Sequence, residues 1–465
     1  MGIRGLLCGL AVSFGLAGQG WAADSASPIV GRISAIDGGV LYHSPEGAWA
    51  PALVNEPVAT GSGVRTVANA EAQWRSPGAR IALAAGSELR VLRLDETVLQ
   101  LALTNGRIGI HLDKAQAAET VEIDLPRGGV WLDKPGEYDI TAGDANTAPT
   151  IRVFGGEVHL GGGLDDRVFA DGSDPFSDWW RSQNDSANLT APQGWTGITG
   201  TTALAGAGRW EHDWKWGDVW FPSDVAIEWA PYRDGVWRYL PPWGWTWIDR
   251  AAWGFTSSHY GRWVRLDDRW GWVPGKELHP ADYSPAAVAF LGTAGIGLSR
   301  PGDIGAAPAI AWFPLAPEET VGDADGAYKN RSFATAVPRA AFTAGLAVAD
   351  TMIEDIPRRR FVEAPVILAA LSIAPDGVPA GKRAPAPSAP LPLASAAEDA
   401  RQPFMVTLRD APPPRPVQRE THKEARKETH KRVRIAILVP RSRPLASAAR
   451  SPHNRAHLAA ARGGA

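Results

Sequence analysis

The segment between Trp210 and Trp312 carries fourteen of the 21 tryptophans, and it limits the possible folds more than any other part of this sequence. It contains a repeat of two segments. In the first, Gly235–Trp237 is followed by Trp243–Trp245, and in the second, Gly261–Trp263 is followed by Trp270–Trp272. Repeated supersecondary units usually stack, since one unit alone cannot bury its apolar face. The pattern predicts two consecutive hairpin-type units of short antiparallel strands.

The tryptophans of the first unit have two possible roles. On a strand, Trp243, Trp245 and Trp247 share one face. Buried, each indole removes about 150–250 Å² from water, worth roughly 4–6 kcal/mol as an upper bound at about 25 cal/mol per Å². Exposed, the stripe would stack on sugar rings or grip a proline-rich peptide. We expect mainly a core, and the candidate ligand-binding residues are Trp243, Trp245, Trp247, Trp270 and Trp272.

Residues 28 to about 160 alternate between apolar and polar side chains, as half-buried strands do. Leu99, Leu101 and Leu103 share one face before Asn105-Gly106, a pair that tolerates the positive φ of a hairpin turn. The same pattern recurs around Gly128-Gly129 and Gly155-Gly156. The sequence predicts an all-β domain with hairpins at these places.

Four segments of this domain resemble the periplasmic FecR-like domain: Gly61–Thr66, Leu103–Ile108, Lys134–Tyr138 and Val153–Val158. The resemblance implies a layered, solenoid-like β domain that acts as an interaction module in the cell envelope. FecR proteins are single-pass membrane regulators that relay a signal from an outer-membrane receptor to a sigma factor through a cytoplasmic N-terminal segment. An export signal at the start of this chain argues against that role, which stays an alternative hypothesis.

The tryptophan block resembles a Trp-rich domain of unknown function found after FecR-like domains in exported bacterial proteins. This resemblance implies an envelope protein and names no activity. The segments that carry it are Val219–Pro222, Trp229–Trp237, Trp253–Phe255, His259–Trp263, Trp270–Gly275 and Ala311–Pro317.

The first 22 residues have the pattern of a Sec-type signal peptide. Arg4 gives the positive region, Leu6–Ala17 the apolar region and Gly20–Ala22 the cleavage site, so we expect cleavage near Ala22 or Ala23 and a periplasmic or secreted protein. No later apolar run reaches the roughly 20 residues of a membrane span. The only cysteine is Cys8, which excludes disulfides and cysteine nucleophiles from the mature chain.

Charge is divided unevenly along the chain. Residues 401–465 hold fifteen Lys or Arg against four Asp or Glu, whereas residues 23–400 hold 31 against 46. The tail from Asp376 is rich in Ala, Pro and Arg, and we expect it to be disordered. It is either a solvated extension or a weak attachment to anionic surfaces. Its apolar run within Lys431–Pro440 is able to add as a strand to a partner.

The titratable residues of this sequence that are candidates for chemistry have structural explanations. His259 lies between aromatic residues, as hydrogen-bonded structural histidines do, and Asp267-Asp268 has the pattern of a turn. Glu318-Glu319 follows a proline and favours a helical turn over an acid/base couple. His422 and His430 lack a third ligand for a metal. We therefore expect no enzyme, no catalytic residues, no cofactor and no metal.

Ser173-Asp174-Pro175 predicts the start of a short helix that docks on a neighbouring domain.

The fold class is mostly β, with a FecR-like layered domain, a Trp-rich repeat and a disordered tail. The expected function is a non-catalytic envelope scaffold that contacts envelope proteins or wall polymers and no nucleic acid, with a peptidoglycan-binding module as an alternative. The expected organisation is signal peptide 1–22, FecR-like domain 24–162, linker with helix 163–209, Trp-rich domain 210–335, extension 336–375 and basic tail 376–465.

Overall fold

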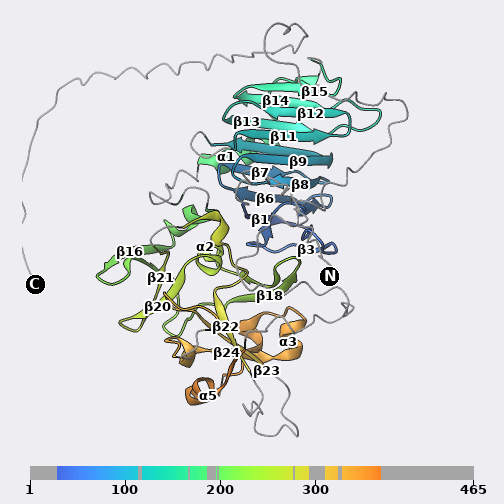
Figure 1. Cartoon of the computed structure of the whole chain (residues 1–465). Coiled ribbons are helices and arrows are strands. Elements are labelled where there is room, and N and C mark those ends of the chain that lie inside the picture. Colours follow the sequence, from blue (N-terminus) through green and yellow to red (C-terminus); the bar gives the residue numbers. More distant parts are fainter. Residues whose placement is uncertain are drawn as a thin grey trace, which may run out of the picture. The chain divides into compact units, whose positions relative to one another are not determined.

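The computed structural model shows a mostly β chain (Figure 1), which confirms the predicted fold class. The predicted signal peptide, its cleavage site and the basic tail lie outside the residues that the structure describes. Those described are 29–113, 118–165, 168–185, 195, 198–275, 278–292, 309–322, 327–354 and 356–367.

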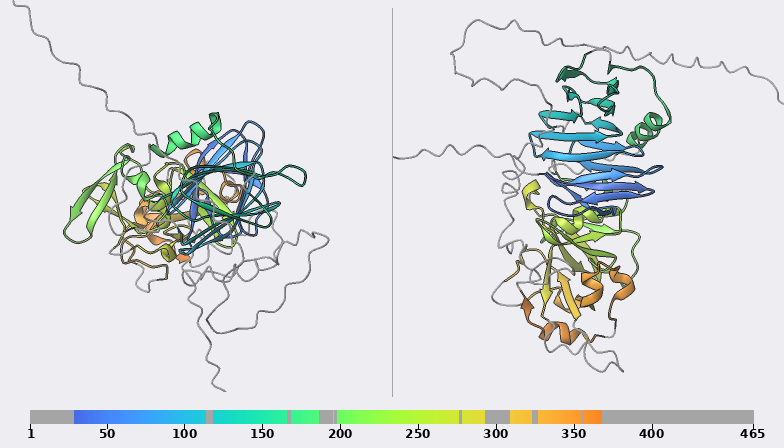
Figure 2. Two further views of the ribbon diagram at one scale, coloured as in Figure 1. Left: turned by 90° about the horizontal axis from the view of Figure 1, so that it is seen from above. Right: turned by 90° about the vertical axis from the view of Figure 1, so that its right-hand side faces the viewer.

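Residues 29–161 form two sheets, which we call the layered unit. The seven-stranded sheet has the order β14-β13-β10-β7-β6-β1-β4 and the eight-stranded sheet β15-β12-β11-β9-β8-β5-β2-β3. The chain crosses repeatedly from one sheet to the other, and Figure 2 shows the resulting layers of strands. The strands are β1 (Gly31–Asp37), β2 (Val40–His43), β3 (Ala50–Pro51), β4 (Pro57–Val58), β5 (Gly63–Thr66), β6 (Glu71–Ser76), β7 (Ala79–Leu83), β8 (Glu88–Leu94), β9 (Val98–Asn105), β10 (Arg107–Leu112), β11 (Thr120–Leu125), β12 (Gly128–Leu132), β13 (Gly136–Thr141), β14 (Thr150–Gly155) and β15 (Val158–Gly161).

The period-two pattern of this unit corresponds to its core. Leu99, Leu101 and Leu103 are buried on β9, and Ile108 and Ile110 are buried on β10 in the other sheet. Alternate side chains of each strand point to the same face, so both strands direct their apolar residues into one hydrophobic cluster.

Two of the three predicted hairpins are wrong. Asn105-Gly106 joins β9 to β10, and Gly155-Gly156 precedes β15 after β14, yet each pair of strands is divided between the two sheets. Gly106 has a φ of 81°, and a Cβ there would lie 2.5 Å from the Cα of Ser87. The glycine is needed for a tight corner between sheets, which requires the same positive φ as a hairpin turn. β11 and β12 form the third predicted antiparallel hairpin, but its turn lies at residues 126–127, and Gly128 and Gly129 belong to β12.

The predicted helix is confirmed as α1 (Pro175–Asp185). Asp174 precedes it, and its Oδ1 accepts a hydrogen bond of 3.0 Å from the backbone N–H of Ser177. Trp180 packs over Gly109 of β10, where a Cβ would come within 2.4 Å of the indole. Arg107 then ties the helix start to the sheet, with ion pairs of 2.7 Å to Asp174 and 2.6 Å to Asp139.

Residues 198–367 form what we call the Trp-rich unit. Its sheets have the orders β16-β17-β21-β20, β18-β19 and β24-β23-β22-β25. Its elements are η2 (Thr201–Leu204), β16 (Gly208–Asp213), β17 (Gly217–Pro222), β18 (Gly235–Leu240), β19 (Gly244–Asp249), α2 (Gly254–His259), β20 (Arg262–Leu266), β21 (Arg269–Val273), η3 (Pro280–Asp282), β22 (Val288–Leu291), β23 (Ala309–Pro314), η4 (Arg331–Phe333), β24 (Thr335–Pro338), α3 (Arg339–Thr343), α4 (Val348–Thr351), α5 (Arg358–Glu363) and β25 (Val366–Ile367).

The two repeat units are antiparallel hairpins, as the sequence predicts: β18 pairs with β19, and β20 pairs with β21. Asp267 and Asp268 form the turn of the second hairpin with φ values of 45° and 62°, which confirms the turn expected there. The second hairpin joins β17 in a four-stranded sheet, whereas β18 and β19 form a two-stranded sheet.

The fold of this unit continues past residue 335. Phe342 of α3 is 2% exposed, and its ring lies 4.4 Å from that of Trp245 between centroids. Phe361 of α5 is buried in a second cluster with Phe313. Among the described residues, no helix is long and apolar enough to cross a membrane.

Candidate binding site where the two units meet

All five candidate tryptophans lie in the interior. The exposed fractions are 4% for Trp243, 6% for Trp245, 0% for Trp247, 5% for Trp270 and 0% for Trp272. They do not form one stripe, because the rings of β19 and β21 pack in different places. The Trp247 ring lies 5.5 Å from that of Trp237, whereas the Trp272 ring lies 6.2 Å from that of Trp210. Rings enclosed in this way offer no continuous platform for a sugar.

Two of the buried indoles, those of Trp263 and Trp272, also use their polar edges inside the protein. Nε1 of Trp272 donates to the carbonyl of Tyr260 over 2.8 Å, and Nε1 of Trp263 donates to that of Ser257 over 2.9 Å. Buried indole N–H groups usually have such an acceptor. These hydrogen bonds fix the ring orientations, which is the behaviour of core residues.

Asn55 connects the layered unit to the Trp-rich unit. Its Nδ2 donates to the carbonyls of Asp249 and Ala251, over 2.9 and 2.7 Å. Its Oδ1 accepts 2.5 Å from Nη1 of Arg32, which also donates to the carbonyl of Ala252 over 3.1 Å. The two side chains thereby satisfy three carbonyl groups at and just after the end of β19, and hold that segment against the layered unit.

The Asp249 side chain, at the end of β19, is buried in the same junction. Its Oδ2 accepts from Nε1 of Trp247 over 2.9 Å, and its Oδ1 accepts from the N–H of Ala251 over the same distance. Burial nevertheless dominates and raises the pKa of Asp249 to about 6, because the charged form loses its hydration.

A second contact between the units is the ion pair of Glu56 and Arg238. The Glu56 carboxylate is 0% exposed, and its Oε1 accepts 2.6 Å from Nη1 of Arg238 on β18. Its Oε2 accepts from the N–H of Leu53 over 2.9 Å. Burial raises the pKa of Glu56, and the guanidinium of Arg238 opposes that rise. The carboxylate is thus engaged in holding the junction.

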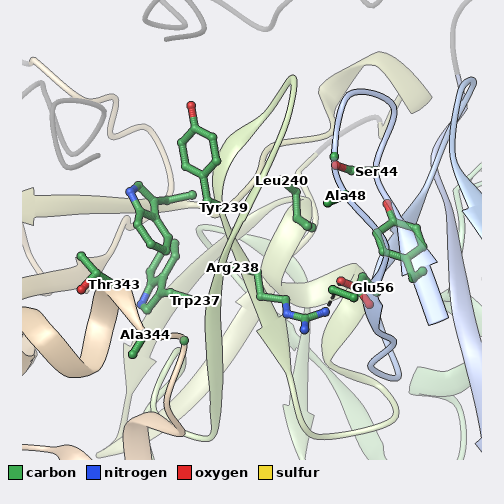
Figure 3. Close-up of a pocket in the computed structure, with 14 residues that line it drawn as sticks. Ser44, Ala48, Glu56, Trp237, Arg238, Tyr239, Leu240, Thr343 and Ala344 are labelled. Carbon is green, nitrogen blue, oxygen red and sulfur yellow. Dashed lines mark hydrogen bonds and ion pairs between the residues drawn. The ribbon is translucent and has the colours of Figure 1, made fainter. Parts of the chain in front are cut away.

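A cavity of about 250 Å³ lies beside this ion pair (Figure 3). Figure 3 shows Trp237 and Tyr239 on one side of β18, and Arg238 and Leu240 on the other, with Glu56 facing Arg238. Of the five candidate tryptophans, Trp245 alone borders the cavity. The layered unit contributes Tyr42, Ser44, Gly47, Ala48, Ala50 and Glu56, and the Trp-rich unit contributes Trp237–Leu240, Trp245 and Thr343–Gly345.

The sequence does not reveal this site. Glu56 and Arg238 are 182 positions apart, and neither belongs to a motif or repeat that relates it to the other. Arg238 lies inside the Trp repeat, so its place on a strand is predictable. Its partner depends on how the two units pack.

The other titratable groups considered from sequence have structural roles. His259 is buried, its Nδ1 lies 2.7 Å from the carbonyl of Ser284, and its ring is 4.8 Å from that of Tyr283. Burial lowers its pKa to about 4. Glu318 lies in a turn with a φ of 73°, and Glu319 accepts 2.8 Å from the N–H of Ala316. In the described part of the chain, no three His, Cys, Asp or Glu residues are grouped to hold a metal.

One tryptophan is very different from the candidates. Trp214, in the turn between β16 and β17, is 90% exposed. The turn is braced by Asp213, whose Oδ1 accepts from the N–H groups of Lys215 and Trp216 over 2.8 and 2.9 Å. The repeat pattern of the sequence does not indicate Trp214. Trp214 lies in a short polar turn outside the repeat, and this position is the feature of the sequence that indicates an exposed ring.

Comparison with known proteins finds a similarity over part of the chain. No curated protein matches. A crystal structure of a candidate anti-sigma factor from Parabacteroides distasonis ATCC 8503 is 12% identical with a TM-score of 0.20, and the match covers 22% of this chain and 48% of that one. The FecR-like relation of the layered unit therefore stays a prediction. Residues 201–319 match the model of a family of unknown function, DUF6600.

Proposed function

We propose that this chain is a non-catalytic, exported cell-envelope protein that serves as an interaction and scaffold module through its two β units. The observation that carries the proposal is the buried polar junction, in which Asn55 and Glu56 hold the backbone of Asp249–Ala251 and the side chain of Arg238. One hydrophobic cluster also includes residues of both units. A buried junction of this kind holds the surfaces of the layered unit and the Trp-rich unit together, as a scaffold requires.

The state of the titratable side chains supports a non-catalytic role. General acid/base catalysis needs a group within reach of substrate and with a pKa near the working pH. Glu56 is enclosed and paired, and His259 is enclosed with a pKa of about 4. Both groups form hydrogen bonds or ion pairs with neighbouring residues of the protein. We propose envelope proteins or wall polymers as partners, with the basic tail adding attraction to anionic surfaces.

The test uses the full mature chain and insoluble peptidoglycan together with an envelope extract. We expect the chain to sediment with one of these and to release no soluble wall fragments. Release of fragments that disappears in Glu56→Gln would contradict the non-catalytic role. A chain that stays in the supernatant with both materials would contradict the interaction role.

Trp214 favours a second candidate, a glycan-binding module. A braced turn that presents a 90% exposed indole is suited to stacking on a sugar ring. Trp214→Ala is then expected to lose retention on peptidoglycan, while Ile227→Ala, which removes a side chain that is 99% exposed, keeps it. Equal retention of both variants and the unmodified chain rules the candidate out. Substitutions at Trp243 or Trp245 would measure stability instead, because those rings are interior.

A further inference from the structure

Three arginines and a histidine form one row across the outer face of the seven-stranded sheet. The strand register places Arg32 of β1 opposite Arg75 of β6. It also places Arg80 of β7 between Arg75 and His111 of β10. In each strand an apolar neighbour of these residues is buried in the core, so the four side chains share the opposite face. Like charges directly opposite one another on a sheet are destabilising, so this row costs stability unless negative charge lies against it.

Carboxylates of the protein balance one end of the row. Oδ1 of Asp113 lies 2.9 Å from Nε2 of His111 and 3.5 Å from Nη2 of Arg80. The strand register continues from His111 to Glu137 of β13, which also pairs with Arg181 of α1 over 2.8 Å. The end of the row that lies toward α1 is therefore neutralised by neighbouring side chains.

The other end of the row has no carboxylate. Arg32 is 5% exposed, and its Nη1 donates only to uncharged oxygens, those of the Asn55 side chain and the Ala252 carbonyl. Nε of Arg32 and Nε of Arg75 are both buried without a hydrogen-bond partner, and no ion pair within the described residues includes either arginine. Burial, and after it a neighbouring arginine, lower the pKa of both guanidiniums, to about 10 for Arg32. Both stay charged at neutral pH, so two positive charges lie side by side without a counter-charge from the described part of the chain.

We propose that Arg75, flanked by Arg32 and Arg80, binds a phosphate group of a ligand on the outer face of the seven-stranded sheet. Arg75 is partly exposed and makes the direct contact, while the arginines on the two adjacent strands, each about 4.8 Å away, add positive charge. A guanidinium presents its N–H groups as a planar fork that matches the oxygens of a phosphate. A phosphomonoester carries a charge of about −1.5 to −2 near pH 7 and so balances two guanidiniums, whereas a carboxylate balances one. This site is additional to the interaction role proposed above.

The experiment measures the chemical unfolding of the full mature chain with millimolar probe, at an ionic strength held constant with sodium chloride. The probes are inorganic phosphate, glycerol phosphate and glutarate, which is a dicarboxylate of similar charge. Cosedimentation with vesicles of phosphatidylglycerol in phosphatidylcholine tests a lipid headgroup as the source of the phosphate. Arg75→Gln removes the central guanidinium. Arg93→Gln is the matched control, because Arg93 lies on the other sheet, is 52% exposed and pairs with Asp95.

We expect phosphate and glycerol phosphate to stabilise the unmodified chain in a saturable manner, because a ligand that binds only the folded state raises the free energy of unfolding. Arg75→Gln should weaken this binding at least about tenfold, the effect of one lost charge-assisted hydrogen bond, while Arg93→Gln keeps it. Without probe, Arg75→Gln should be at least as stable as the unmodified chain, because it relieves the repulsion within the row. Vesicle binding that is lost in Arg75→Gln and kept in Arg93→Gln assigns the phosphate to a lipid, and stabilisation by the soluble probes alone assigns it to a soluble ligand.

Three results overturn the proposal. The first is stabilisation by glutarate as strong as that by phosphate, and the second is no stabilisation by any probe. The third is an Arg75→Gln variant that is less stable without probe and binds phosphate as the unmodified chain does, since Arg75 would then have a structural role. If Arg75→Gln does not fold, the comparison of phosphate with glutarate on the unmodified chain decides. Sedimentation with envelope material, measured in parallel, tests the proposed interaction role separately.

Discussion

Nη1 of Arg238 donates to the fully buried carboxylate of Glu56 over 2.6 Å and so joins two strand-rich units across 182 positions of the sequence. A buried carboxylate is costly unless it is paired and hydrogen-bonded. The N–H of Leu53 supplies the second hydrogen bond, so the charge is satisfied only when both units are in place.

Removing one partner of this ion pair should be strongly destabilising. Arg238→Ala leaves an unpaired buried carboxylate, and we expect the free energy of unfolding to fall by about 3 kcal/mol. Urea denaturation followed by tryptophan fluorescence measures it. Arg250→Ala is the matched control, because Arg250 pairs with Asp234 at the surface with 63% of its side chain exposed, and it should cost under about 1 kcal/mol. Equal costs would mean that the buried pair has no special role.

The tryptophans should divide into two classes. Trp247→Ala removes a fully buried ring, and we expect a loss of about 3–5 kcal/mol of stability. Trp214→Ala removes a ring that is 90% exposed, and the change should stay within about 0.5 kcal/mol. Chemical denaturation of both variants under the same conditions checks this. A Trp247→Ala variant as stable as the unmodified chain would contradict the interior placement of the repeat.

Asp249 should make the chain more stable in mild acid. Its pKa is raised to about 6 in the folded chain, so the folded state binds a proton more readily than the unfolded state. The resulting stabilisation is complete below the unfolded pKa of about 3.9 and is lost as the pH rises through 6. Relative to Asp249→Asn, the unmodified chain should gain about 1 kcal/mol from pH 7 to pH 5. Denaturation curves at both pH values measure the difference, and a constant difference would refute it.

His259 should act in the opposite direction. Its pKa is lowered to about 4 by burial, so the neutral ring favours the fold above the unfolded pKa of about 6.5, and that stability is lost as the pH falls toward 4. Relative to His259→Gln, the unmodified chain should lose about 2 kcal/mol from pH 7 to pH 5. The same denaturation series checks this effect. If the His259→Gln variant lost as much stability between pH 7 and pH 5 as the unmodified chain, His259 would not be the cause of that loss.

The sequence predicts local structure well wherever that structure depends on the residues of a single strand or turn. The period-two run through Leu99–Leu103 and the Asp174 cap of α1 have the expected structures, because each depends on side chains close in sequence. The hairpin turn predicted at Asn105-Gly106 is wrong, because a corner between two sheets requires the same positive φ as a hairpin turn.

The candidate site was much harder to predict. The Trp repeat correctly indicated hairpins, but periodicity cannot distinguish a stripe on the surface from one that is covered on both faces. Residues after 335 provide part of that cover, since Phe342 lies against Trp245. The hydrogen bonds of Asn55 to β19 join positions 194 and 196 apart, and no local pattern records them.

The junction itself is tested most directly by calorimetric unfolding of the full mature chain, unmodified and with Asn55→Ala. Asn69→Ala is the control, because Asn69 has a similar positive φ of 60° but an exposed side chain. We predict one transition for the unmodified chain and for Asn69→Ala, with a calorimetric enthalpy equal to the van't Hoff enthalpy. Asn55→Ala should separate the melting of the two units. Two transitions in the unmodified chain, or no separation in Asn55→Ala, would contradict a scaffold held together at Asn55.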